Sequence, residues 1–196
     1  MKILACDTAI GTGSVCLYDG GVVALIRTEE MHKQAEKLIP NIEAILAEAG
    51  WKYSDLDLLA TTIGAGSFTG VRIGLAAIRG IALASGLKVV GVTTLQAIAY
   101  GEGECLAILN AGRGQVYAQK FDENSVPIYD IKLMDYDAIP EGVKIVGNLD
   151  IDGVLYKEPD AVAVARYAFA NADLAKNGVE ISPVYVRQPD AIPQKK

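Results

Sequence analysis

Two segments of the chain, residues 3–19 and residues 105–122, carry the same pattern of secondary structure. Each reads as an apolar strand, a polar turn that contains glycine, and a second apolar strand. Such a repeat predicts an internal duplication, with a boundary near residues 101–103. We therefore expect a first lobe over residues 1–102 and a smaller second lobe over residues 103–196.

The first half of the chain predicts a mixed sheet with helices packed on its faces. Apolar and β-branched runs predict strands at residues 2–8, 14–19, 22–28, 57–63 and 88–93. Apolar residues at helical spacing predict helices at residues 32–50 and 68–85, and Pro40 should bend or restart the first of them. A meander followed by alternating strands and helices is typical of an α/β fold.

The second half predicts a shorter version of the same arrangement. The two strands within residues 105–122 are followed by expected strands at residues 125–133 and 143–148. A C-terminal helix is expected over residues 160–178, and the tail from Arg187 onward is expected to be loose. These residues are too few to repeat everything that the first half contains.

The composition is that of a soluble globular protein, with 51% hydrophobic and 21% charged residues. The net charge of −6 opposes tight, unaided binding to a polyphosphate such as RNA. Cys6, Cys16 and Cys105 are odd in number and widely spaced, so we expect reduced thiols in a reducing compartment. The apolar run before Asp7 is too short for a signal peptide, so we expect a cytoplasmic protein without a membrane segment.

The segment Gly64–Gly74, GAGSFTGVRIG, is similar to a phosphate-binding loop that leads into a helix. It fits neither common pattern, because valine and arginine follow Gly70 and because Thr69 stands where the dinucleotide fingerprint needs glycine. Residues 58–101 also contain no Asp or Glu that would bind a ribose or Mg²⁺. Two readings stay open: an anion site at the helix N-terminus, or a tight turn in which Ser67 or Thr69 caps the helix.

The helix expected over residues 68–85 is apolar or small on almost every side. Val71 and Ile78 share one face, and Gly74 and Ala77 lie on others. A helix of this kind must be covered on two sides, one of which is its own sheet. The second cover is either the neighbouring helix or a partner subunit.

Four blocks of sequence, taken in order, closely resemble the TsaB (YeaZ) family. They are ILACDTAIGTGSVCLYDGG, MHKQAEKLIPNI, GAGSFTGVRIGLAAIRGIALASGLKVVGVTTLQAIA and LNAGRGQVYAQKF. The match runs from Met1 to about Phe121 and is strongest at SFTGVRIG. The resemblance implies an α/β, actin/sugar-kinase-like (ASKHA) fold of two related lobes, each a mixed sheet flanked by helices, with the second lobe abbreviated.

The resemblance also implies a function. Members of the family assist a paralogue, TsaD, which transfers a threonylcarbamoyl group to an adenosine beside the anticodon of tRNA. A separate synthase makes the donor, threonylcarbamoyl-adenylate, and in bacteria an ATPase, TsaE, joins the assembly. The TsaB member of the assembly is non-catalytic and also pairs with itself. The resemblance therefore implies that this chain is a scaffold and that it forms a homodimer in isolation. It also implies that the chain contacts tRNA only through the complex.

In the family, contact with TsaD is made by the two helices of the first lobe. Carried over to this sequence, the resemblance implies a partner interface formed by His32, Ala35, Leu38, Ile42, Phe68, Gly70, Val71, Gly74, Ala77, Ile78 and Ile81. The single histidine, His32, matches a histidine common at that point in the family, and packing at an interface is a more ordinary role for it than that of a base.

Two positions bear on a catalytic metal. TsaD-like paralogues carry two histidines, four residues apart, where this chain has Thr94 and Ile98. Neither side chain can replace imidazole, so no metal site is expected here.

Four residues of the first turn are expected to form a vestigial nucleotide-binding site: Asp7, Thr8, Gly11 and Thr12. In the superfamily, an Asp in the first turn of each lobe holds Mg²⁺-phosphate, and Asp7 matches the first of these. The second is replaced by Asn110, and Gln115 stands where relatives often carry Glu, so independent ATP hydrolysis is not expected. We expect the chain to have no cofactor of its own, and the alternative is ATP or ADP bound at a subunit interface. If Asp7 binds no nucleotide, its ordinary role is that of a carboxylate that caps its own turn.

Three other functions stay open. The first is an ATPase or a small-molecule kinase that uses Asp7, since fold alone does not exclude an enzyme. The second, a glycoprotease-like peptidase, fits poorly because there is one histidine and no HExxH motif. The third is a module that only associates with itself.

Overall fold

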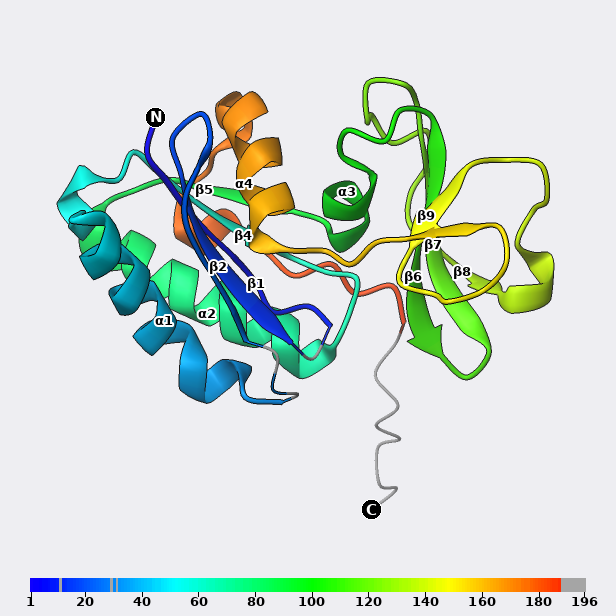
Figure 1. Ribbon diagram of the computed structural model, residues 1–196, viewed down its shortest axis with the longest axis horizontal. Helices are drawn as coiled ribbons and strands as arrows, with labels where there is room; N and C mark the ends of the chain where they lie inside the picture. Colours follow the sequence, from blue (N-terminus) through cyan, green and yellow to red (C-terminus); the bar gives the residue numbers. More distant parts are fainter. Residues whose placement is uncertain (11, 29, 31, 188–196) are drawn as a thin grey trace, which may run out of the picture.

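The computed structural model describes residues 1–10, 12–28, 30 and 32–187, which form two lobes that lie side by side (Figure 1). Each lobe is built on a five-stranded mixed sheet. The first sheet has the order β3-β2-β1-β4-β5, formed by β1 Ile3–Asp7, β2 Gly13–Tyr18, β3 Val22–Thr28, β4 Leu58–Thr62 and β5 Val89–Val92. The second has the order β10-β9-β6-β7-β8, formed by β6 Cys105–Gly112, β7 Gln115–Phe121, β8 Lys132–Asp135, β9 Ile145–Gly147 and β10 Val154–Tyr156.

The two sheets share one topology. The central strands β1 and β6 each pair antiparallel with the next strand of the chain and parallel with β4 and β9, respectively. The outer strands repeat the same relation, antiparallel at β3 and β8 and parallel at β5 and β10. The predicted actin/sugar-kinase-like fold of two related lobes is thereby confirmed, while the division of the chain at residue 102 stays a prediction.

Helices cover both faces of the first sheet. They are α1 Gln34–Ala49 and α2 Phe68–Ser85 on one face and α4 Ala161–Ala170 on the other. Successive residues of β1 point to opposite faces, so Leu4 and Cys6 pack with α1 and α2, whereas Ile3 and Ala5 pack with α4. This sheet is therefore buried on both faces, which explains its continuous apolar strands.

The lobes exchange helices. The short helix α3, Thr94–Ala99, follows the first sheet along the chain but packs on the second, and α4 follows the second sheet but packs on the first. The two helices meet where Gln96 Nε2 donates a hydrogen bond to the Tyr167 hydroxyl at 3.0 Å. In the described part of the chain, loop residues such as Ile139 and Leu149, rather than helices, cover the outer face of the second sheet. The second lobe is abbreviated in this sense.

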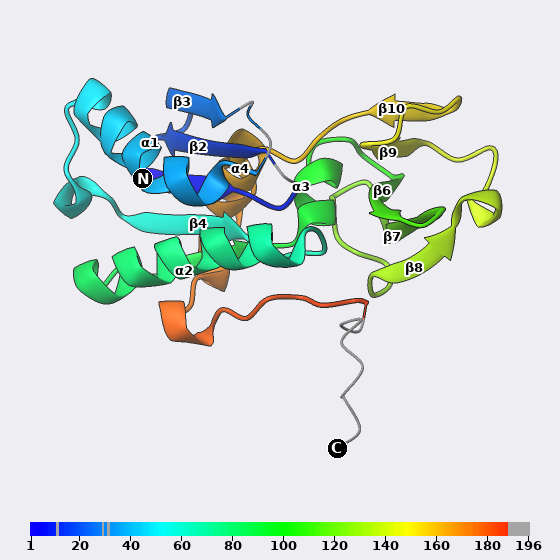
Figure 2. The ribbon, with the colours of Figure 1, turned by 90° about the horizontal axis from the view of Figure 1, so that it is seen from below.

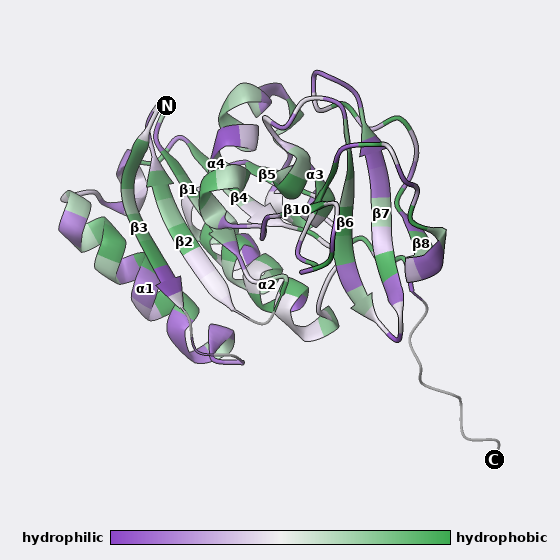
Figure 3. Ribbon diagram, turned by 45° about the vertical axis from the view of Figure 1, so that its right-hand side comes forward, coloured by the Kyte–Doolittle hydropathy of each residue, from purple (hydrophilic) through white to green (hydrophobic). Residues whose placement is uncertain are grey.

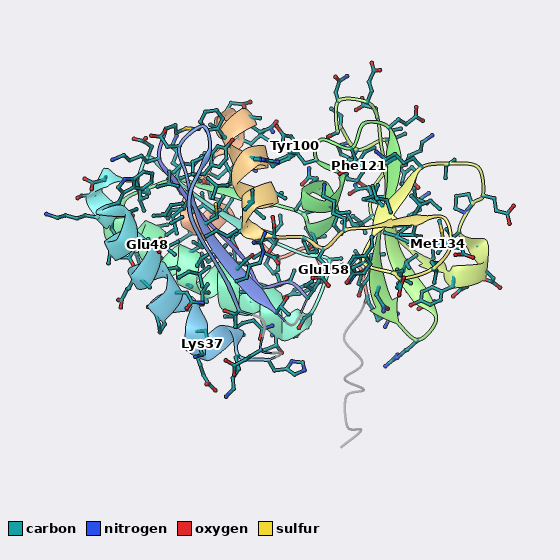
Figure 4. All side chains as sticks on the ribbon, viewed as in Figure 1. Lys37, Glu48, Tyr100, Phe121, Met134 and Glu158 are labelled. Atoms are coloured by element: carbon teal, nitrogen blue, oxygen red, sulfur yellow. The ribbon has the colours of Figure 1, made fainter. Side chains whose placement is uncertain are left out.

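Helix α1 is amphipathic and runs without a break from residue 34 to residue 49. Of the two expectations for Pro40, the restart is therefore wrong, and the bend stays a prediction. Its inner face is buried, and its outer side chains include Lys37 and Glu48, which are labelled in Figure 4. The mixture of hydrophilic and hydrophobic residues along α1 is visible in Figure 3. Gly50, with φ +66°, ends the helix in a left-handed conformation that suits glycine.

Candidate functional site

The segment Gly64–Gly74 forms a tight turn from β4 into α2. Ser67 caps the helix by accepting a hydrogen bond from the amide of Gly70 at 3.1 Å. A Cβ on Gly70 would lie 2.1 Å from the carbonyl oxygen of Thr8, and a Cβ on Gly74 would lie 2.6 Å from Thr8 Oγ1. These glycines allow α2 to lie directly against the end of β1, so the structure supports the turn with Ser67 as its N-cap.

The predicted partner interface divides into covered and uncovered residues. The chain's own core buries Leu38, Ile42, Gly70, Val71, Gly74 and Ile78. The exposed or half-buried members are His32, Ala35, Phe68, Ala77 and Ile81. Helical periodicity explains the division, because one stripe of each helix faces the sheet of its own lobe. A partner that docks on this folded chain meets only the outer faces of the helices.

The outer face of α2 carries two exposed large apolar side chains. The side chain of Leu83 is 82% exposed and that of Phe68 is 44% exposed, and only 33% of the helix is buried. By length and apolar composition alone, α2 could cross a membrane, but core helices of soluble proteins can have the same length and composition. Because Leu75 and Ile78 pack in the core of the first lobe, α2 is a core helix with one uncovered apolar face.

Three side chains form a stack at the start of α2. The guanidinium carbon of Arg72 lies 3.7 Å from the ring centre of Phe68, and its Nε donates to the Tyr185 hydroxyl at 2.8 Å. The rings of Phe68 and Tyr185 lie 4.9 Å apart. Tyr185 comes from the C-terminal segment, so two distant parts of the sequence build this surface together.

Asp7 lies at the carboxyl end of β1 and is almost fully buried, with 2% of its surface exposed. Its Oδ1 accepts a hydrogen bond from the amide of Ala9 at 3.3 Å, as the turn-capping reading predicts. Burial raises the pKa of Asp7 to about 7; the Thr62 hydroxyl and the Ala9 amide oppose the shift, and Asp160 and Glu158 add to it. At neutral pH this carboxyl group is therefore divided between its charged and neutral forms.

Asp7 faces the connection between β10 and α4. It lines a cavity of about 430 Å³ together with Thr12, Arg27 and residues 156–160. Of the other residues expected near it, Thr8 is buried and donates its hydroxyl to the carbonyl of Gly70 at 2.7 Å, and Gly11 lies outside the described residues. Thr8 therefore fastens α2 to β1 and has no free hydroxyl hydrogen for a ligand.

Asn110 lines a different cavity, of about 410 Å³, between the turns of the two lobes. Its Oδ1 accepts hydrogen bonds from the amide of Gly112 and the hydroxyl of Tyr136. Asp7 is thus among the residues that line one cavity, and Asn110 is among those that line another. His32, two residues before α1, lines the second cavity as well.

The residues at the paralogues' metal positions lie inside α3. Thr94 and Ile98 are fully buried, and Ile98 packs against the second sheet. Within residues 1–10, 12–28, 30 and 32–187, no group of three or more His, Cys, Asp or Glu side chains is placed to hold a metal ion.

Sequence reasoning missed the ion pairs at the connections between the lobes. Arg27 Nη2 lies 2.7 Å from Asp160 Oδ2, and Glu102 contacts Lys157 at 2.7 Å and Lys144 at 3.1 Å. The hydrogen bond from Lys157 lowers the pKa of Glu102. These partners are 42 to 133 residues apart along the chain, and no periodic pattern marks such pairs.

Two related lobes of one topology, with turns from both lobes facing a central cavity, define the class as an actin/sugar-kinase-like protein. A family model described as "TsaD: tRNA N6-adenosine threonylcarbamoyltransferase" matches residues 18–177. The Escherichia coli tRNA threonylcarbamoyladenosine biosynthesis protein TsaB is 36% identical over 134 residues, which cover 64% of this chain and 58% of that protein. The chain belongs to this family, within its TsaB (YeaZ) branch.

Longer matches agree with this assignment. An uncharacterized protein of Mycobacterium bovis is 31% identical over 200 residues, covering 97% of this chain and 94% of that protein. The structure of YeaZ from Pseudomonas aeruginosa, 24% identical, superposes with a TM-score of 0.76 over 94% of this chain and 99% of that one. This last similarity shows the fold alone. In the match to the E. coli relative, the chain spans little more than half of that protein's length.

Proposed function

We propose that this chain is an accessory subunit in the formation of threonylcarbamoyladenosine in tRNA. It docks on a TsaD-like catalytic subunit and favours that subunit's active conformation. The proposal is supported by the TsaB-named relatives and by the match to the TsaD family model. On this proposal the chain is cytoplasmic and catalyses no step itself.

The observation that carries the proposal is the uncovered apolar face of α2. Monomeric proteins seldom leave such faces open, and contiguous apolar patches on them usually mark a binding site. Arg72 and Tyr185 are of the residue types that contribute most binding energy at interfaces, and Phe68, which they contact, is of a type enriched there. A TsaD-like subunit covers this face in the complex, and a second copy of the chain covers it in isolation.

The charge of the chain supports an RNA contact made through other subunits. A net charge of −6 opposes tight, unaided binding of this chain to the phosphates of tRNA. The tRNA is therefore held by the catalytic partner, and a TsaE-like ATPase joins the same assembly. The threonylcarbamoyl donor comes from a separate synthase.

The experiment that tests the proposal is threonylcarbamoyl transfer to tRNA by a TsaD-like subunit with its donor synthase. The reaction is run with and without this chain, and with this chain alone. We expect transfer only when both proteins are present. Equal transfer without the chain would remove the accessory role.

The docking face is tested with Leu83→Glu. A carboxylate at this exposed position would be buried without a partner in the complex, so we expect the affinity for the TsaD-like subunit to fall by at least about tenfold. The matched control is Val126→Glu, which places the same charge on an exposed residue of the second lobe and should leave the affinity unchanged. Calorimetric titration measures both. An unchanged affinity in Leu83→Glu would move the docking surface away from α2.

Nucleotide binding is the second candidate function. The cavity of about 410 Å³ favours it, because Gly66 and Ser67 at the start of α2 line it together with the end of β6 around Asn110. A nucleotide in this cavity would contact backbone amides, since the carboxylates for Mg²⁺ are not gathered around it. Calorimetry with Mg-ATP, with and without the TsaD-like subunit, tests this candidate, and the absence of heat in both titrations would dispose of it.

A further inference from the structure

The C-terminal segment of residues 176–187, here called the strap, is fastened along the first lobe. Lys176 pairs with Val89 through two backbone hydrogen bonds of 2.8 and 2.9 Å. The amide of Val184 donates to the carbonyl of Ile63 at 2.7 Å, and Ile181 is buried in the core beneath α2. The strap therefore follows α2 closely, as Figure 2 shows.

The far end of the strap is fastened to the second lobe. Arg187 Nη1 donates to the carbonyl of Ala111 at 3.0 Å, and Nη2 donates to Gln115 Oε1 at 2.7 Å. Val186 packs against the apolar cluster of α3 and the second sheet. Arg187 thus holds the turn between β6 and β7, and the expectation of a loose tail is wrong at this residue; residues 188–196 lie outside the described part.

The two other connections between the lobes lie elsewhere. One leads from β5 into α3, and the other leads from β10 into α4 and contains Glu158, labelled in Figure 4. Lys157 binds Glu102, and Asp160 binds Arg27, so the second connection is fastened to both lobes. In Figure 2 this connection and the strap run along opposite sides of the molecule.

We propose that the strap is a lock that holds the two lobes at one fixed angle. Apart from the strap, the lobes are joined by α3, α4, their connections and the packing of Ile10 and Ala65 against the apolar cluster of the second lobe. Lobes joined in this way can rotate about that side, as in hinge motions of two-domain proteins. The strap joins the lobes on the opposite side and so prevents this rotation. In the locked state, the end of β6 that carries Asn110 and Ala111 keeps its place in the lining of the cavity between the lobes.

The lock is tested by measuring the distance between the lobes in the full-length chain. Nitroxide labels are placed at two exposed residues, Ala44→Cys on α1 and Asp137→Cys in the second lobe. The three native cysteines are buried, and burial raises the pKa of Cys6 to about 12, so the label reacts with the introduced thiols. Pulsed electron paramagnetic resonance then gives the distribution of distances.

The decisive variant is Arg187→Ala. Loss of two hydrogen bonds from a charged donor should raise the ratio of swung to locked molecules by about tenfold or more, which adds a second distance to the distribution. Gln115→Ala removes one of the two acceptors and should give a smaller change of the same kind. It also provides the test if Arg187→Ala fails to fold.

Arg166→Ala is the matched control, because Arg166 lies exposed on α4, away from the strap. It should keep the distribution of the unmutated chain. The same distribution in Arg187→Ala and Gln115→Ala as in this control would overturn the lock. No partner protein is used, so this test can fail or succeed independently of the proposed function.

Discussion

Gly70→Ala should lower the free energy of unfolding by about 3 kcal/mol or more, the upper range for overpacking a core. The new methyl group would lie 2.1 Å from the carbonyl oxygen of Thr8, which is a backbone atom and cannot rotate away. The same contact is tightened by the hydrogen bond of 2.7 Å from Thr8 Oγ1 to the carbonyl of Gly70. Relief requires that α2 move away from β1, and this movement opens the core of the first lobe.

The matched control is Gly80→Ala, which changes another glycine of the same helix. No atom lies within 4 Å of a Cβ at Gly80, so only helix propensity changes, and we expect a gain of about 0.5–1 kcal/mol. Urea unfolding followed by circular dichroism measures both variants. Equal shifts in the two would mean that α2 does not need glycine where it crosses β1.

Local sequence pattern was sufficient for most of the first lobe. The helix predicted over residues 68–85 has these bounds in the structure, and the predicted strands at residues 57–63 and 88–93 contain β4 and β5. Periodicity did not identify which faces of the helices are uncovered. Where a helix such as α2 is apolar on nearly every side, the hydrophobic pattern no longer distinguishes the stripe that its own sheet buries.

Prediction of the second lobe was less accurate. The strand expected over residues 125–133 is wrong for most of its length, since β8 is Lys132–Asp135, and residues 122–126 instead form a turn in which Ser125 has φ +61°. The helix expected over residues 160–178 ends at Ala170. Helix α3 and strand β10, with six and three residues, are too short to carry a periodic signal.

The contacts and cavities between the lobes could not be predicted from the sequence. The strap has no regular spacing of apolar residues, and its anchors, such as Ile63 for Val184 and Gln115 for Arg187, are far away along the chain. The cavities that Asp7 and Asn110 line likewise depend on how the lobes sit together. The sequence could name both residues as candidates but could not show the surroundings of either one.

Asp7→Asn should raise the free energy of unfolding at pH 8 by roughly 2–4 kcal/mol, since one pKa unit corresponds to about 1.4 kcal/mol. The pKa of Asp7 is about 7 in the folded chain because burial disfavours the carboxylate, against an ordinary value of 3.8. The folded state therefore holds a proton that the unfolded state releases between these two values. It follows that the stability contributed by protonated Asp7 is fully present below about pH 4 and is lost as the pH rises to 7 and above.

Asparagine at position 7 is neutral at every pH, and its side-chain oxygen can still accept the hydrogen bond from the amide of Ala9. The free energy of unfolding should therefore decline less steeply between pH 4 and pH 7 in Asp7→Asn. The difference in slope should equal the contribution that ionisation of Asp7 makes in the unmutated chain. Asp130→Asn, which removes an exposed carboxylate, is the control and should keep the slope of the unmutated chain. Urea unfolding across this pH range measures all three proteins. If Asp7→Asn and Asp130→Asn keep the same slope, Asp7 is ionised in the folded chain, and its burial is compensated by a group that binds the carboxylate.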